Sequence, residues 1–142
     1  MDRRARRYYD ELGEDYPTSI RQLVPAYDDL TGMIAGLLAR AAPGTILDVG
    51  CGEGTLTSRI LESLPGARIT AVDASASMLD TARQRLGEMA ERVHFVQTDL
   101  EEWHGESRFE AAYSNLVLHN LAPERKTVVL GRIRDSLLPG SP

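Results

Sequence analysis

The stretch from Ile46 to Thr57, ILDVGCGEGTLT, constrains the fold of this chain more than any other. An apolar run of strand character ends there at three glycines, Gly50, Gly52 and Gly54, which alternate with other residues. Glycine tolerates positive φ and has no Cβ to keep a ligand away from the backbone. The residues that follow predict a helix, whose first N–H groups have no partner inside the helix. The stretch therefore predicts a strand, a tight loop and a helix that hold a ligand against the backbone.

Strands and helices are predicted to alternate along the rest of the chain. Strands are predicted at 45–49, 68–72, 93–97 and within 109–118, and helices at 56–64, at 75–90 and from residue 123 to the Pro-Gly pair at 139–140. The order predicts an α/β fold of three layers, with a mainly parallel sheet between helices. We expect one domain over residues 1–142, in which an N-terminal helical cap (1–42) precedes a Rossmann-like core (43–142).

Polar residues stand where the four predicted strands end: Asp48, Asp73, Asp99 and Asn115. In a parallel sheet these positions meet at one edge, beyond the carboxyl ends of the strands, where ligands bind. Asp73 could accept hydrogen bonds from both hydroxyls of a ribose, and it could also cap the following helix. Asp99 could accept from an adenine amino group, and it could equally be a turn or cap aspartate.

The spacing of the glycines separates three kinds of nucleotide loop. A P-loop needs Lys and then Ser or Thr after its last glycine, whereas Thr55 and Leu56 stand there. The dinucleotide pattern needs G-x-G-x-x-G, which disfavours an NAD-dependent oxidoreductase. Asp48 and Glu53 would repel a pyrophosphate but attract a cation. A cationic ligand is therefore favoured over a dinucleotide, and over a turn that binds nothing.

Four segments in order, ILDVGCGEGTLT, ITAVDASASML, VHFVQTDL and FEAAYSNLVLHNL, resemble the successive motifs of the class I S-adenosylmethionine-dependent methyltransferases. The resemblance extends from about Thr45 to Gly140. The stretch YYDELGEDYPTSIRQLVPAYDDLTGMI resembles, more loosely, a branch that includes the carboxy-S-adenosylmethionine synthase of tRNA wobble-uridine modification and its small methyltransferase relatives. The resemblance implies S-adenosylmethionine as cofactor, with a methyl acceptor that is a small molecule or is related to tRNA.

The resemblance also implies a place for each candidate residue. The glycine loop and Asp48 would approach the methionine part of the cofactor, Asp73 the ribose and Asp99 the adenine edge. Asn115 would line the substrate mouth, and Tyr27 would close over the cofactor from the N-terminal helices. The cofactor-binding candidates are Tyr27, Asp48, Gly50, Cys51, Gly52, Gly54, Asp73, Ala74, Met78, Asp99, Leu100 and Asn115.

Methyl transfer from a sulfonium is an in-line displacement, so the protein mainly supplies proximity and orientation. A general base is needed only if the acceptor must lose a proton, and His119 is the candidate, with a structural histidine as the alternative. Met78 could flank an adenine ring or simply belong to the core. Cys51 is interpreted as a small residue that fits the loop rather than as a nucleophile. No metal is expected, because a single cysteine cannot form a cysteine-based zinc cluster.

The composition restricts the binding partners and the cellular compartment that we expect for this chain. The net charge of −5 argues against nonspecific nucleic-acid binding, although tRNA stays open and four arginines (Arg3, Arg4, Arg6 and Arg7) crowd the N-terminus. No apolar run approaches the ~18 residues of a membrane span. The single cysteine fits a reducing compartment, so a cytoplasmic protein is expected.

The sheet of this family normally continues beyond the fourth strand. We therefore expect the last strands and their substrate loops to lie outside this chain, and the fourth strand to form a long apolar edge that a second copy, in a homodimer, could cover. Three alternatives to a methyltransferase stay open on these grounds. They are a non-catalytic or truncated S-adenosylmethionine-binding module, a carboxy-S-adenosylmethionine synthase-like transferase and, disfavoured, the NAD-dependent oxidoreductase.

Overall fold

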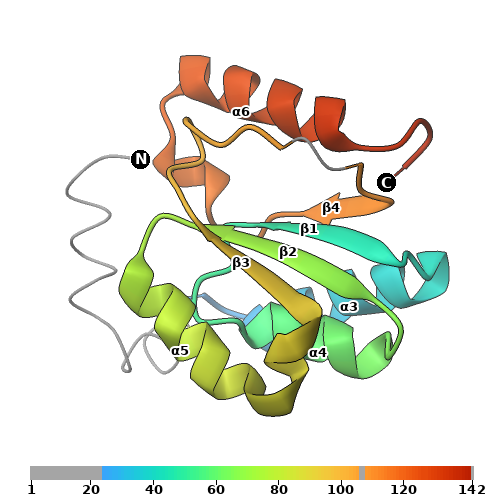
Figure 1. Ribbon diagram of the computed structural model, residues 1–142. Helices are drawn as coiled ribbons and strands as arrows, with labels where there is room; N and C mark the ends of the chain where they lie inside the picture. Colours follow the sequence, from blue (N-terminus) through green and yellow to red (C-terminus); the bar gives the residue numbers. More distant parts are fainter. Residues whose placement is uncertain (1–23, 106–107, 142) are drawn as a thin grey trace.

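The computed structural model describes residues 24–105 and 108–141 and has three layers (Figure 1). Helices α3, α4 and α5 cover one face of a central sheet, and α6 covers the other. The elements in order are α3 (Tyr27–Ala41), β1 (Thr45–Val49), α4 (Thr55–Ser63), β2 (Arg68–Asp73), α5 (Ala76–Leu86), η2 (Gly87–Arg92), β3 (Val93–Gln97), β4 (Ala111–Tyr113), η3 (Leu118–Asn120) and α6 (Pro123–Ser136). The predicted three-layer α/β architecture is confirmed.

The four strands are parallel and lie in the order β3-β2-β1-β4. β1 is therefore central, and its residues from Ile46 to Val49 are buried. A strand covered on both faces needs a continuous apolar run, which is what this segment supplies except at Asp48. All four strands end at one edge of the sheet, as the sequence predicts.

Side chains alternate between the two faces of the strands and form two apolar clusters. The cluster under α3, α4 and α5 includes Ile46, Ile60, Leu61, Ile69 and Leu86. The cluster under α6 includes Leu47, Val49, Val72, Phe109 and Val129. These two clusters fix the register in which the polar strand ends meet.

The helix predicted at 75–90 is shorter than expected. Ser75 caps it, because its Oγ accepts a hydrogen bond from the backbone N of Met78 at 3.3 Å. The α-helix ends at Leu86, since Gly87 adopts a φ of 53°, and the 3-10 helix η2 continues to Arg92. The predicted single long helix over 75–90 is therefore wrong.

The expectation of a long apolar edge at the fourth strand is also wrong. β4 has only 3 residues, and the backbone beside it is already engaged. Phe109 forms a parallel bridge with Leu137; its N donates to Ser136 O at 2.9 Å, and its O accepts from Leu138 N at 2.9 Å. The fourth strand therefore gives no reason to expect that a second copy of the chain covers it.

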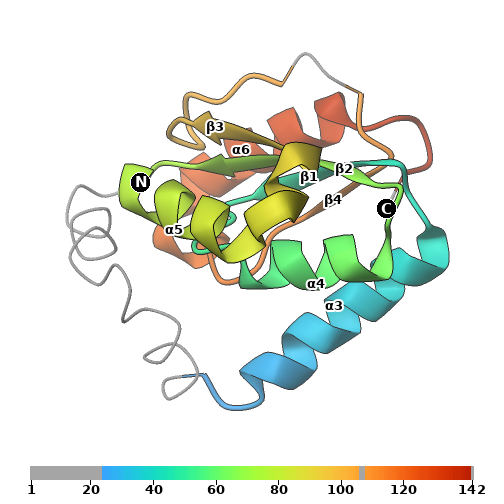
Figure 2. The same cartoon turned by 60° about the horizontal axis from the view of Figure 1, so that its bottom comes forward.

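Helix α3 is the described part of the predicted cap over residues 1–42; the four N-terminal arginines lie outside the described residues. Figure 2 shows α3 lying beside α4, and Arg59 of α4 joins the two helices. Its Nη1 donates to Asp28 O at 2.9 Å and to Thr31 Oγ1 at 2.8 Å, and its Nη2 pairs with the Asp28 carboxylate at 2.7 Å. The domain boundary at residue 42 stays a prediction.

Within the described segments, every helix is too short or too polar to cross a membrane.

Candidate functional site

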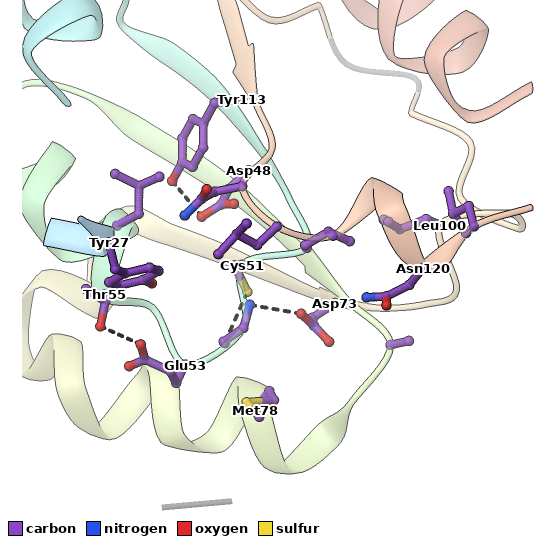
Figure 3. A pocket seen from close by; sticks show the side chains of 18 residues that line it. Tyr27, Asp48, Cys51, Glu53, Thr55, Asp73, Met78, Leu100, Tyr113 and Asn120 are labelled. Atoms are coloured by element: carbon purple, nitrogen blue, oxygen red, sulfur yellow. Dashed lines mark hydrogen bonds between the residues drawn. The ribbon is translucent and has the colours of Figure 1, made fainter. Parts of the chain in front are cut away.

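A cavity opens at the carboxyl edge of the sheet (Figure 3). Its walls come from the glycine loop, the end of β2, the start of α5, the segment after β4 and the first residue of α3. The lining residues are Tyr27, Asp48, Gly50, Cys51, Gly52, Glu53, Thr55, Leu56, Asp73, Ala74, Met78, Leu100, Tyr113, Asn115, Leu116, Val117, Asn120 and Leu121. Three of them are acids, and no Lys, Arg or His of the described segments is among them.

The glycine loop folds back over the end of β2. The backbone N of Gly50 and that of Cys51 both donate to Val72 O, at 2.8 and 3.1 Å. Gly50 adopts a φ of 78°, and a Cβ on it would lie 2.4 Å from Cγ2 of Val117. Glycine is required here because a side chain would both strain the backbone and collide with the segment after β4.

Gly54 serves the packing of helices rather than the cavity. It is the N-cap of α4 with a φ of 80°, and a Cβ on it would lie 3.0 Å from Cβ of Ala82 on α5. It does not line the cavity. Its lack of a side chain lets α4 and α5 approach each other, so the structure supplies a packing reason for the third glycine.

Asp73, the last residue of β2, is oriented by backbone donors. Its Oδ2 accepts from Gly52 N at 2.9 Å, and its Oδ1 accepts from Ser75 N at 2.9 Å. It lines the cavity beside Ala74 and Met78. A carboxylate oxygen can accept more than one hydrogen bond, so this half-buried group can also receive a pair of ligand hydroxyls.

Asp48 near the end of β1 is only 2% exposed and takes its donors from side chains. Thr57 Oγ1 donates to its Oδ2 at 2.6 Å, and the Tyr113 hydroxyl donates to the same oxygen at 2.5 Å. Burial raises the pKa of this carboxyl to about 7; the two hydroxyls act to lower the pKa, and the charge of Asp73 raises it further. Asp48 can therefore change its charge near neutral pH.

Glu53 is the third acid, and its charge is compensated. Thr55 Oγ1 donates to its Oε1 at 2.5 Å, and Arg85 Nη2 pairs with its Oε2 at 2.5 Å. Arg85 Nε also donates to the backbone O of Glu53 at 3.0 Å. The pair holds the loop on α5 and compensates the charge of this third acid.

Cys51 lines the cavity but is not activated. Burial, together with the charges of Asp48 and Asp73, holds the pKa of its thiol well above the usual value. A thiol that stays protonated is a poor nucleophile. The described residues also contain no group of three His, Cys, Asp or Glu side chains that could hold a metal ion.

The cavity brings together most of the predicted residues. Those that line it are Tyr27, Asp48, Gly50, Cys51, Gly52, Asp73, Ala74, Met78, Leu100 and Asn115. Asp99 does not line it; its Oδ1 accepts from Glu101 N at 3.0 Å in a turn, and its neighbour Leu100 reaches the cavity instead. His119 is exposed on η3 and also lies outside the lining.

Several lining residues were not predicted from the sequence: Thr55, Leu56, Tyr113, Leu116, Val117, Asn120 and Leu121. Tyr113 and Asn120 lie inside the segment FEAAYSNLVLHNL, so a polar residue near a strand end was the available signal. The apolar residues after β4 carry no such signal in the sequence. They line the cavity because the chain turns at Leu116, which adopts a left-handed φ of 56°.

Comparison with known proteins gives consistent results. Residues 46–140 match the family described as methyltransferase domain. The chain is 34% identical over 123 residues to a trans-aconitate 2-methyltransferase of Azoarcus sp. (strain BH72), which covers 84% of this chain and 46% of that protein. It is also 34% identical over 143 aligned positions to a carboxy-S-adenosyl-L-methionine synthase of Pseudomonas putida (strain F1), which covers 94% of this chain and 58% of that protein.

Solved structures have the same fold. A structure described as the DhpI-SAM-HEP complex matches with a TM-score of 0.72 at 25% identity, over 94% of this chain and 59% of that one. The N-methyltransferase NodS of Bradyrhizobium japonicum WM9, in complex with S-adenosyl-l-homocysteine, matches with a TM-score of 0.79 at 22% identity, over 92% of this chain and 66% of that one.

The chain spans about half the length of the curated relatives it matches, 46% and 58% for the two named above. The family match nevertheless covers β1 from its second residue, the glycine loop, β2, β3, β4 and α6. By its motifs, its sheet and this match, the chain belongs to the S-adenosylmethionine-dependent methyltransferase family.

Proposed function

We propose that the cavity binds S-adenosylmethionine and that the protein transfers its methyl group to a small-molecule acceptor. One observation carries the proposal: the carboxylates of Asp48 and Asp73 stand at the ends of adjacent strands in a cavity whose described lining has no basic side chain. Such a site attracts a cation and repels a pyrophosphate. S-adenosylmethionine has an ammonium, a sulfonium and a ribose diol, which match these acids.

The chain offers a distinct group to each part of this ligand. We assign the ribose hydroxyls to Asp73, whose orientation is fixed by Gly52 N and Ser75 N. Met78 and Leu100 are buried apolar residues at the same end and suit the faces of an adenine. We assign the amino-acid part of the ligand to Asp48 and the glycine loop. We place Asn115 at the mouth where the acceptor enters.

When bound, S-adenosylmethionine supplies an activated methyl group on a sulfonium. The residues of this chain bind and orient it, which is the main catalytic demand of such a displacement. Tyr27 helps to exclude water, because it is 8% exposed and lies over the cavity from α3. The Tyr27 carbonyl oxygen accepts a hydrogen bond from Thr31 Oγ1 at 3.0 Å, and Thr31 Oγ1 in turn accepts one from Arg59 Nη1.

Calorimetric titration with S-adenosylmethionine, S-adenosylhomocysteine and NAD tests the binding step. We expect the first two ligands to bind and NAD to give no heat. Binding of NAD alone would overturn the proposal in favour of an oxidoreductase. Transfer of a labelled methyl group to a metabolite extract then separates an enzyme from a binding module, since a module would bind the donor without passing on the label.

A second candidate is a transferase that modifies the donor itself. The relative from Pseudomonas putida, a carboxy-S-adenosyl-L-methionine synthase, favours it because that match covers 94% of this chain. Mass spectrometry of the recovered donor distinguishes the two reactions. In an incubation with the metabolite extract, which must supply the carboxyl group from a carboxylated co-substrate, a donor that gains a carboxyl group supports the second candidate. A donor that loses its methyl group to an acceptor supports the first.

A further inference from the structure

The hydrogen bonds on Asp48 are arranged unevenly. The Tyr113 hydroxyl from β4 donates to Oδ2 at 2.5 Å (Figure 3). Thr57 Oγ1 from α4 donates to the same oxygen at 2.6 Å. No residue of the described segments donates to Oδ1. Because Asp48 lines the cavity, this arrangement leaves one oxygen for a group inside it.

The two donors cannot easily move. Tyr113 is 9% exposed and Thr57 is 1% exposed, so packing restricts the movement of both side chains. Tyr113 lies directly opposite Asp48 in the register of β1 and β4. The pairing of the strands thus fixes the distance between the phenol and the carboxyl, and with it the orientation of Oδ1.

The surroundings of Asp48 are otherwise unfavourable to a negative charge. Its titratable neighbours are Tyr113 on β4, Cys51 in the glycine loop and Asp73 at the end of β2, and Tyr27 of α3 lines the same cavity. None of these is a cation. The hydroxyls of Tyr113 and Thr57 are therefore the described side-chain donors that favour the ionised carboxylate.

We propose that Tyr113 is a positioning residue for the donor: its hydroxyl favours the ionised form of Asp48 and orients the carboxyl so that Oδ1 accepts from the ammonium of the amino-acid part. This rests on the proposed function. The role belongs to the phenol oxygen, since a phenylalanine would fill the same space on β4 without donating. Tyr113 acts through Asp48 and needs no contact with the ligand.

The test is Tyr113→Phe titrated with S-adenosylhomocysteine, which has the ammonium, and with 5′-methylthioadenosine, which lacks the amino-acid part. If the lost donor raises the pKa of Asp48 by about one, the ionised fraction at pH 7 falls from about one half to about one eleventh. We expect S-adenosylhomocysteine to bind about ninefold more weakly at pH 6, about fivefold at pH 7 and about twofold at pH 8, where the ligand ammonium itself begins to titrate. The affinity for 5′-methylthioadenosine should stay within about twofold.

Calorimetry in buffers of different ionisation enthalpy adds a readout that loss of packing would not move. The wild type should release protons on binding S-adenosylhomocysteine at pH 7, and Tyr113→Phe should release more, because more Asp48 starts protonated. Thr57→Val should act in the same direction. Thr81→Val is the matched control, since the Thr81 hydroxyl donates to Ser77 O within α5 at 3.0 Å, away from Asp48.

The outcomes separate the two proposals. Unchanged binding of S-adenosylhomocysteine by Tyr113→Phe overturns the positioning role and leaves the proposed function standing. Equal weakening of both ligands at every pH also overturns it, because it shows a general loss of cavity structure. A wild-type protein that binds neither ligand overturns the proposed function, and the role of Tyr113 with it.

Discussion

β1 and β2 each place an aspartate at the same edge of the sheet, yet the two carboxylates are held in opposite ways. Asp73 is half-buried and accepts from the backbone N of Gly52 and of Ser75. Asp48 is 2% exposed and accepts from the side chains of Thr57 and Tyr113. Backbone donors persist whatever the sequence, whereas side-chain donors are lost by one substitution. The orientation of Asp73 at the end of β2 is therefore insensitive to substitution of its partners, whereas the orientation and pKa of Asp48 in β1 can be changed by one substitution.

The largest expected effect concerns the charge of Asp48. Its pKa lies at about 7 in the fold against an ordinary 3.8, so the folded state binds the proton more tightly. Its contribution to stability is full below about pH 4 and is lost as the pH rises to about 7. Asp48→Asn has no carboxyl and does not lose this stability as the pH rises. The difference in unfolding free energy, variant minus wild type, should therefore increase by roughly 4 kcal/mol between pH 4 and pH 7.5.

Urea unfolding at several pH values measures the difference. Asp135→Asn is the control, because Asp135 is exposed and pairs only with its neighbour Arg134 in the described structure. A difference for Asp48→Asn that does not vary with pH would mean that the fold does not raise the pKa of Asp48, and it would end the contrast between the strand ends.

Gly50→Ala should damage both strand ends at once. The new Cβ would lie 2.4 Å from Val117 at a φ of 78°, so both backbone strain and overpacking oppose it. We expect a loss of about 3 kcal/mol of unfolding free energy. Gly36→Ala on α3, where a Cβ meets nothing within 4 Å, should be neutral or slightly stabilising. Equal stability of the two variants would show that the loop relaxes away from Val117.

Asp73→Ala should weaken S-adenosylhomocysteine binding about a hundredfold, because two hydrogen bonds to a charged group are lost. The weakening should be the same at pH 6 and at pH 8, unlike that of Tyr113→Phe. Asp80→Ala, an exposed position on α5 that pairs with Arg83 at 2.8 Å, is the matched control for calorimetry. Wild-type affinity in Asp73→Ala would place the ribose elsewhere.

The smallest effect is expected at His119, which lies outside both strand ends. Its side chain is exposed and off the cavity lining, so His119→Ala should change S-adenosylhomocysteine affinity by less than about twofold. Methyl-transfer assays with the same variant test the predicted general base. A large fall in turnover with unchanged donor affinity would support that prediction.

The sequence predicts best what local pattern determines. Alternating apolar runs give the strands and helices, and Ser75 gives the cap of α5. The glycines give the loop, since all three adopt positive φ. The placement of Asp73 follows from the end of β2, because its partners lie within the loop and the next turn.

What the sequence misses depends on distant residues. Tyr113 reaches Asp48 only because β4 pairs with β1, and no spacing rule connects them. Asp99 has a turn partner two residues away, which competes with a ligand role that its strand-end position predicts. The long fourth strand fails for the same reason: Phe109 is engaged by Leu137 after α6, a contact that hydrophobicity alone does not specify.

The bond between Tyr113 and Asp48 also bears on how the site comes into being. It joins residues 65 apart in the sequence, with α4, β2, α5, η2 and β3 between them. Closing so long a loop is slow compared with forming one helix or one local strand-helix-strand unit. During synthesis Asp48 emerges before Tyr113. We therefore expect the cavity to mature late in folding, and the appearance of a carboxyl that titrates near pH 7 to report its completion.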